Sequence, residues 1–172
     1  GVVIDGKIFE GAHAGGAELG HTSLIMGGEP CTCGRKGCVE AYASATALIR
    51  DAKRAAIKNP QSQMNALCGW NIENMNGKIP FDAAWNGDET AKQVVDNYIT
   101  YLGEAITNFV NIFRPDVVLL SGGVCNQKEH LTDPLNAYIK NTCFAKEKAM
   151  IPPVRCAILG NSAGIIGAAN LI

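Results

Sequence analysis

A run of twenty residues, HTSLIMGGEPCTCGRKGCVE (residues 21–40), constrains this chain more than any other part of it. The run holds one histidine, three of the chain's seven cysteines and four glycines. Imidazole and thiolate groups are the donors that a structural zinc ion prefers, and such a site takes four of them in a tetrahedron. Glycines permit the tight turns that bring the donors together. The run therefore predicts a metal site with four candidate ligands, His21, Cys31, Cys33 and Cys38.

Two other interpretations of these cysteines stay open, a disulfide framework and three unrelated thiols. An odd total of seven cysteines in 172 residues argues against a framework, which is typical of small secreted domains. Three unrelated thiols so close together would remain unsatisfied in a reduced protein. Since the other cysteines lie among apolar neighbours, we expect reduced core residues and a cytoplasmic protein; they are Cys68, Cys125, Cys143 and Cys156.

The composition argues against several classes of partner. Hydrophobic residues make up 47% of the chain and charged residues 18%, which is typical of a globular domain. A net charge of −1 without a basic block argues against nucleic-acid binding by this segment. Apolar runs such as 117–120 and 164–172 are too short to cross a bilayer, so no membrane partner is expected. Because the chain opens on Gly1 in a strand-like run, we expect a segment of a longer protein.

Hydrophobic spacing and turn residues predict the elements of the first half. Asp5-Gly6 is a favoured type I′ turn pair, which predicts a β-hairpin over residues 2–9. An alanine-rich run with apolar residues three or four apart, ended by an Asn-Pro pair, predicts one helix over 39–58. A loop with one short helix is expected at 60–80, and another short helix at 81–85.

The second half reads as alternating helices and strands. A long helical pattern follows Asp88 and ends at Arg114-Pro115. Residues 117–124 predict a buried strand running into a glycine turn, a common place for a ligand in α/β proteins. A helix near 128–141, a strand near 154–159 and a capped helix over 161–172 complete the order, which predicts an α/β layer architecture.

The residues then carry a family resemblance. ELGH (18–21) followed by CTCGRKGCVE (31–40) resembles the signature of the ROK family of repressors and sugar kinases. SGGV (121–124) resembles the adenosine-contacting turn of that family, and LGNSAGIIGAA (159–169) resembles its closing helix. The resemblance implies an actin-like ATPase, ribonuclease H-like fold of two lobes. Residues 1–172 would form the larger, C-terminal lobe, with a zinc-binding loop.

The resemblance also implies roles for individual residues. His21 and the three nearby cysteines would ligate zinc, while Glu18, His21 and Glu40 would face the sugar. A solvated loop or helix-terminal position is the alternative for the two glutamates. Gly122 and Gly123 would let a nucleotide approach the backbone, or form a simple turn. The same cleft would be lined by Asn161, Ala163 and Gly164.

By resemblance the parent protein is an ATP- and Mg²⁺-dependent hexose kinase, a glucokinase in particular, because RKGCVEAYASATALIR is similar to the glucokinases of the family. Fructose, N-acetylmannosamine and other hexoses stay open as substrates. The catalytic aspartate would lie in the other lobe, so no catalytic residue is expected here and the isolated chain should be inactive. The alternative is a sugar-sensing repressor whose DNA-binding domain lies outside this chain. The resemblance implies a homo-oligomer, in the simplest case a dimer, in either class, and the 88–113 helix has enough apolar positions to permit an interface.

Overall fold

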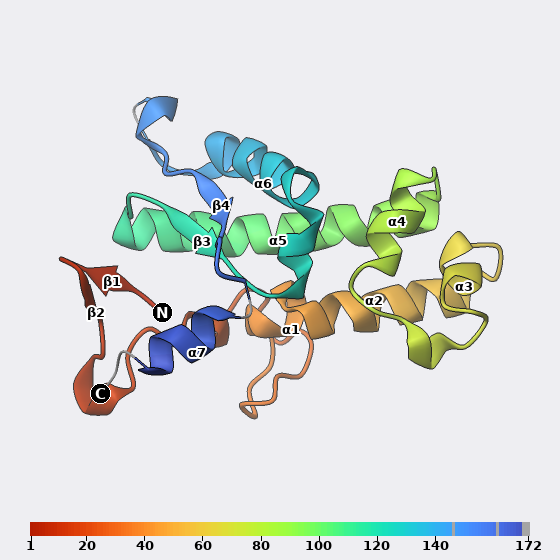
Figure 1. Cartoon of the computed structure of the whole chain (residues 1–172), viewed down its shortest axis with the longest axis horizontal. Helices are drawn as coiled ribbons and strands as arrows, with labels where there is room; N and C mark the ends of the chain where they lie inside the picture. The colour runs from red at the N-terminus through yellow and green to blue at the C-terminus, as the bar shows by residue number, and fades with distance from the viewer. Residues whose placement is uncertain (146, 161, 170–172) are drawn as a thin grey trace.

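The long helix α5 (Glu89–Phe113) runs through the middle of the molecule in this computed structural model, which describes residues 1–145, 147–160 and 162–169 (Figure 1). Its apolar residues recur three or four positions apart, and most of them are buried against the neighbouring helices. The helices that pack on it are α1 (Glu40–Ala43), α2 (Ala45–Lys58), α4 (Ile79–Trp85) and α6 (Glu129–Thr142). The main apolar core therefore lies between helices.

Two small sheets accompany the helices. Strands β1 (Val3–Ile4) and β2 (Lys7–Ile8) form the predicted hairpin, and Asp5 and Gly6 both take positive φ, 51° and 74°. Strands β3 (Val118–Leu120) and β4 (Val154–Cys156) pair in parallel. The predicted burial of the strand at 117–124 is wrong, because Leu119 is 61% exposed. The strand at 154–159 is also shorter than predicted.

The single helix predicted over 39–58 is two helices, α1 and α2, separated at Ser44. Ser44 has extended backbone angles (φ −84°, ψ 162°), and its hydroxyl accepts a hydrogen bond from the backbone N–H of Ala47 at 3.1 Å. This is the geometry of a helix N-cap, for which serine is a preferred residue. The break leaves Glu40 at the start of a separate one-turn helix beside the cysteine-rich loop.

The other predicted helices are confirmed with small shifts, and residues 161 and 170–172 of the predicted closing helix lie outside the described residues. Asp88 caps α5, and the helix ends where Arg114 adopts a left-handed conformation (φ 44°) before Pro115. Residues 60–80 hold one short α-helix, as predicted, and a turn of 3₁₀ helix. The remaining elements are α3 (Gln63–Leu67), η1 (Ala12–Ala14), η2 (Leu19–His21), η3 (Ile72–Asn74), η4 (Gly123–Gln127), η5 (Lys148–Met150) and α7 (Ser162–Ala169).

The β1–β2 hairpin and α7 lie at one end of the molecule, while α3 and α4 lie at the other (Figure 1). The cysteine-rich loop joins η2 to α1 along the side of the helical core. Over the ranges that the structure describes, each helix is too short or too polar to serve as a membrane span.

Candidate metal centre

The cysteine-rich loop folds back on itself through tight turns. Isolated antiparallel bridges pair Ser23 with Cys38 and Pro30 with Lys36, and the Cys31 N–H donates to the Arg35 carbonyl at 2.9 Å. These bonds draw the two cysteine-bearing ends of the loop to the same place. Local backbone pairing therefore contributes directly to the shape of the site, and the fully buried Cys38 joins the loop to the apolar core.

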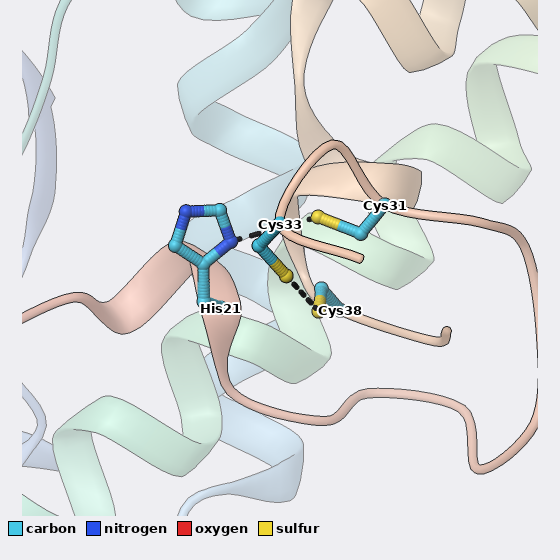
Figure 2. Close-up of side chains that lie close together, drawn as sticks. All are labelled: His21, Cys31, Cys33 and Cys38. Atoms are coloured by element: carbon cyan, nitrogen blue, oxygen red, sulfur yellow. Dashed lines mark hydrogen bonds between the residues drawn. The ribbon is translucent and has the colours of Figure 1, made fainter. Parts of the chain in front are cut away.

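The loop brings the four predicted ligands together (Figure 2). One donor atom from each of His21, Cys31, Cys33 and Cys38 lies within 4.8 Å of the others. His21 Nδ1 is 3.5 Å from Cys31 Sγ, and Cys33 Sγ is 3.7 Å from Cys38 Sγ. A tetrahedral zinc ion with ordinary bond lengths would separate a nitrogen and a sulfur by about 3.6 Å and two sulfurs by about 3.8 Å. Both pairs therefore fit a single tetrahedral ion.

The thiols of the cluster differ in their surroundings. Cys38 is fully buried, and burial raises the pKa of its thiol to about 11, whereas a hydrogen bond from the Arg35 backbone lowers the pKa of the exposed Cys33 thiol. A bound cation would favour the thiolate form of each of them. All seven cysteines fall within the described residues and none is in a disulfide, so the structure gives the framework interpretation no support.

Glu40 lies directly beside the cluster. Its Oε1 accepts hydrogen bonds from the Thr32 hydroxyl at 2.9 Å and from the Cys31 thiol at 3.5 Å. Glu18 is exposed and immediately precedes η2, the turn that carries His21, and its carbonyl accepts the His21 N–H at 3.0 Å. The structure thus brings Glu40 to the candidate ligands and places Glu18 at the start of the same turn.

Two polar side chains of the site were missed by reasoning from the sequence. Thr32 holds the Glu40 carboxylate, and Arg35 donates from Nη1 to the His21 carbonyl at 3.0 Å. Both lie between the cysteines of the motif, which is the only signal that could have pointed to them.

The residues expected at a nucleotide site lie elsewhere, after β3 and in α7. Gly122 has φ 100°, and a Cβ atom built on either Gly122 or Gly123 would meet nothing within 4 Å. The backbone there is open to a ligand. Ala163 and Gly164 belong to the first turn of α7, and Asn161 lies outside the described residues. Because β3 and β4 are parallel, the glycine turn and the segment leading to α7 leave the same edge of the sheet.

A comparison with family models decides the relationship. The model of the ROK family matches residues 1–172, the whole chain. The chain belongs to the ROK family. ROK kinases have an actin-like ATPase fold, and the mixture of helices and sheet in this ROK chain agrees with it.

Curated glucokinases are among the relatives of this ROK chain. It is 35% identical to the glucokinase of Halalkalibacterium halodurans over 173 residues, which cover 100% of the chain and 52% of that protein. It is also 35% identical to the glucokinase of Thermotoga maritima, covering 100% of the chain and 54% of the relative. The chain therefore spans about half the length of these relatives.

A solved structure and a regulator extend the comparison. The ROK glucokinase of Streptomyces griseus, crystallised with glucose and AMPPNP, superposes with a TM-score of 0.88 at 30% identity, over 98% of this chain and 55% of that one. The DNA-binding transcriptional dual regulator NagC of Escherichia coli is 26% identical over 100% of this chain and 40% of its own length. The family thus contains both sugar kinases and regulators similar to this chain.

Proposed function

We propose that this chain is the larger, C-terminal lobe of an ATP-dependent hexose kinase that converts glucose and ATP to glucose 6-phosphate and ADP. The observation that carries the proposal is the convergence of one imidazole and three thiols beside the Glu40 carboxylate. The identity with glucokinases along the entire chain supports it. A reducing, cytoplasmic setting suits the seven free thiols.

Zinc would act as a scaffold in this proposal. His21 turns Nδ1 toward Cys31, so a metal bound there leaves Nε2 for a sugar hydroxyl. The carboxylates of Glu18 and Glu40 would each accept hydrogen bonds from sugar hydroxyls. Zinc would supply rigidity, and the sugar would be bound by the side chains around it.

The open turn at Gly122 and Gly123, together with Asn161, Ala163 and Gly164, would contact ATP accompanied by Mg²⁺. The catalytic base would come from the other lobe, and for this reason the isolated chain is expected to be inactive. A homodimer is also proposed, although most apolar side chains of α5 are buried in the chain's own core. The interface would therefore have to use other surfaces.

The test uses the full-length protein. Elemental analysis should find one zinc ion per chain, and a coupled ADP-release assay over a panel of hexoses should give the highest kcat/KM with glucose. Glu40→Gln should raise the KM for the sugar and leave the KM for ATP nearly unchanged. A protein that is folded and active without zinc, or an unchanged sugar KM in the variant, would contradict the proposed roles.

A sugar-sensing repressor is the second candidate, favoured by the match to NagC along the whole chain. Such a protein would bind the sugar through the same residues without phosphorylating it. The two candidates differ outside this chain, in a catalytic aspartate or a helix-turn-helix. Sugar binding without ADP release, together with sugar-dependent binding to operator DNA, would select the repressor.

A further inference from the structure

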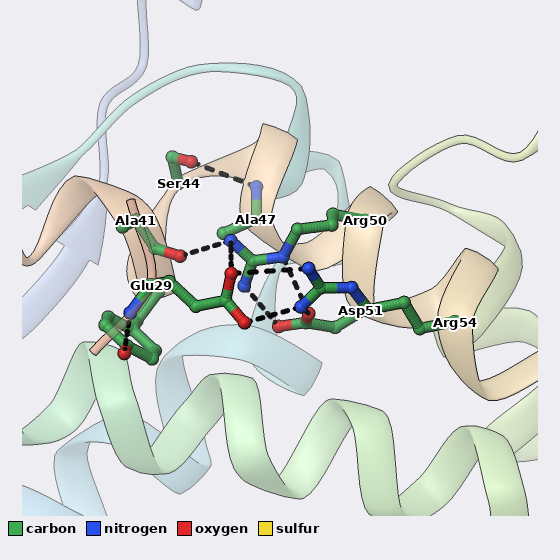
Figure 3. A network of polar contacts seen from close by, with 8 residues as sticks. Glu29, Ala41, Ser44, Ala47, Arg50, Asp51 and Arg54 are labelled. Atoms are coloured by element: carbon green, nitrogen blue, oxygen red, sulfur yellow. Dashed lines mark hydrogen bonds and ion pairs between the residues drawn. The ribbon is translucent and has the colours of Figure 1, made fainter. Parts of the chain in front are cut away.

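A second polar network, separate from the metal donors, contacts the cysteine-rich loop (Figure 3). Two arginines of α2, Arg50 and Arg54, lie one helical turn apart and face the loop and the end of α1. We call this network, formed by Glu29, Tyr42, Arg50, Asp51 and Arg54, the clasp.

The first set of contacts in the clasp, which we call its first arm, binds the loop just before the first cysteine. Arg54 Nη1 and Nη2 donate to the two carboxylate oxygens of Glu29 at 2.6 and 3.3 Å, and Arg50 Nη1 lies 3.8 Å from Glu29 Oε2. Glu29 is followed by Pro30 and then by Cys31. Fixing Glu29 therefore fixes the direction in which the chain enters the first thiol ligand.

The second set of contacts, the second arm, binds α1 just after Glu40. Arg50 Nη1 donates to the Ala41 carbonyl at 2.8 Å, and the Tyr42 hydroxyl accepts the Glu29 N–H at 2.6 Å. A one-turn helix leaves its own carbonyls without intrahelical partners, so outside donors decide how it is oriented. The two arms meet at Arg50, which connects the loop before Cys31 to the helix that begins with Glu40.

The clasp is only partly open to water. The side chains of Glu29 and Arg50 are 28% and 26% exposed and Tyr42 is 7% exposed, whereas the Arg54 side chain is 52% exposed. A groove of about 500 Å³ between α2 and α5 lies over the network. Asp51 holds Arg50 in place with two 2.8 Å hydrogen bonds. Bidentate arginine–carboxylate pairs such as these are geometrically more specific than single ion pairs.

We propose that the clasp is a positioning device that works independently of the metal, and that Arg50 and Arg54 set sugar affinity by fixing Glu40 and the approach to Cys31. The part concerning sugar rests on the proposed kinase or sugar-binding function. Neither arginine belongs to the donor cluster, so both act through Ala41 and Glu29.

The test compares four variants of the full-length protein, Arg50→Met, Arg54→Met, Arg54→Lys and Lys58→Met. Lys58 is the matched control because it ends the same helix and lines the same groove. The two arginine-to-methionine variants should raise the sugar KM 5- to 20-fold, with kcat, the ATP KM and zinc content within twofold of the parent. Arg54→Lys should recover part of the loss, and Lys58→Met should match the parent.

A second measurement is independent of catalysis. Backbone amide hydrogen exchange over residues 31–42 should become at least tenfold faster in both arginine-to-methionine variants, while exchange in α5 stays unchanged. If either variant fails to fold, Glu29→Gln, which keeps the size of the side chain, replaces it in both measurements.

Unchanged exchange at 31–42 would overturn the clasp, and faster exchange with an unchanged sugar KM would overturn its role in affinity. A parent protein that neither phosphorylates nor binds any hexose would instead defeat the proposed function. The exchange measurement would still decide whether the clasp orders the loop.

Discussion

Two glycines of the cysteine-rich loop have nearly the same backbone conformation and very different surroundings. Gly34 and Gly37 have φ of 87° and 83°. A Cβ atom on Gly34 would point into open space, whereas one on Gly37 would lie 1.7 Å from the Ile25 carbonyl oxygen. A side chain introduced at either position would therefore be strained by the backbone conformation, but only a side chain at Gly37 would also clash with a neighbour.

This difference gives a matched pair of variants. Gly34→Ala should cost about 1–2 kcal/mol of stability from the left-handed conformation alone. Gly37→Ala must also move the backbone at Ile25 and should cost about 3 kcal/mol or more. We expect Gly37→Ala to lose zinc on elemental analysis and Gly34→Ala to retain it. Equal zinc contents and equal melting temperatures would show that the close approach at Gly37 is not needed.

Asp88 is a buried carboxylate that ties two helices together. Its oxygens accept bonds from the Ser62 hydroxyl and the Gln63 N–H, both at 2.6 Å, and from the Ala91 N–H at 3.0 Å. Asp88→Ala removes the cap of α5 and leaves these donors unpaired, so the free energy of unfolding should fall by about 2–4 kcal/mol. Asp96→Ala, which breaks only an exposed pair with Lys92, should change it by less than about 0.5 kcal/mol in the same denaturant titration.

Asp88 should also make stability depend on pH. Burial alone would raise its pKa, but the hydrogen bonds from Ser62 and the backbone outweigh burial and lower it. Because the pKa is lower in the folded than in the unfolded state, the stabilisation is complete above the unfolded value of about 3.9 and is lost as the pH falls through the folded value. Asp88→Asn should therefore have a flatter stability profile below about pH 4. Profiles of the same slope in variant and parent would contradict this assignment.

Among the helices, α5 and α6 make an unusually close approach. A Cβ atom on Gly103 of α5 would lie 2.6 Å from the ring of Tyr138 on α6. Alanine favours a helix over glycine by about 1 kcal/mol, but forcing the ring aside should cost about 1–3 kcal/mol. We expect Gly103→Ala to lower the melting temperature and Tyr138→Leu to suppress this effect in a double-mutant cycle. A stabilising Gly103→Ala substitution would show that the helices can separate freely.

Several elements could be predicted because their signals are local. Asp5-Gly6 specifies the hairpin, and Pro115 marks the end of α5. The break at Ser44 was hidden because the alanines around it continue the helical pattern, although serine is a good N-cap. The exposure of Leu119 depends on which elements cover the β3–β4 sheet, and strand patterning does not report that.

For the molecule as a whole, the donor cluster lies mostly outside the helical core, and only one of its four ligands, Cys38, is fully buried. The main core cluster begins at Leu48, beyond the last candidate ligand. Removing the metal with a chelator should therefore abolish sugar binding and speed amide exchange over 21–42, while the far-UV circular dichroism of the helices changes by less than about a tenth. A cooperative loss of the helical signal on chelation would show that the core depends on the ion.

The candidate site was only partly predictable at this scale. Spacing and residue type were enough to group the four donors, whereas Glu40 was placed beside them only by the family resemblance. The clasp joins Glu29 to arginines more than twenty positions later, and an arginine pair on a helix looks like an ordinary solvated face in the sequence. Which residues these arginines contact depends on how α2 packs against the loop, and the hydrophobic periodicity of a helix does not report that.

All four donors lie between residues 21 and 38, and this closeness bears on how the protein is made. A ring closed within so short a stretch loses little chain entropy, because the cost of closure grows with the length of the loop. A nascent chain leaving the ribosome carries the complete donor set before α2, and long before α5, has been synthesised. Capture of an ion at that stage would give the emerging lobe an ordered starting point, to which Arg50 and Arg54 then attach the first helix of the core.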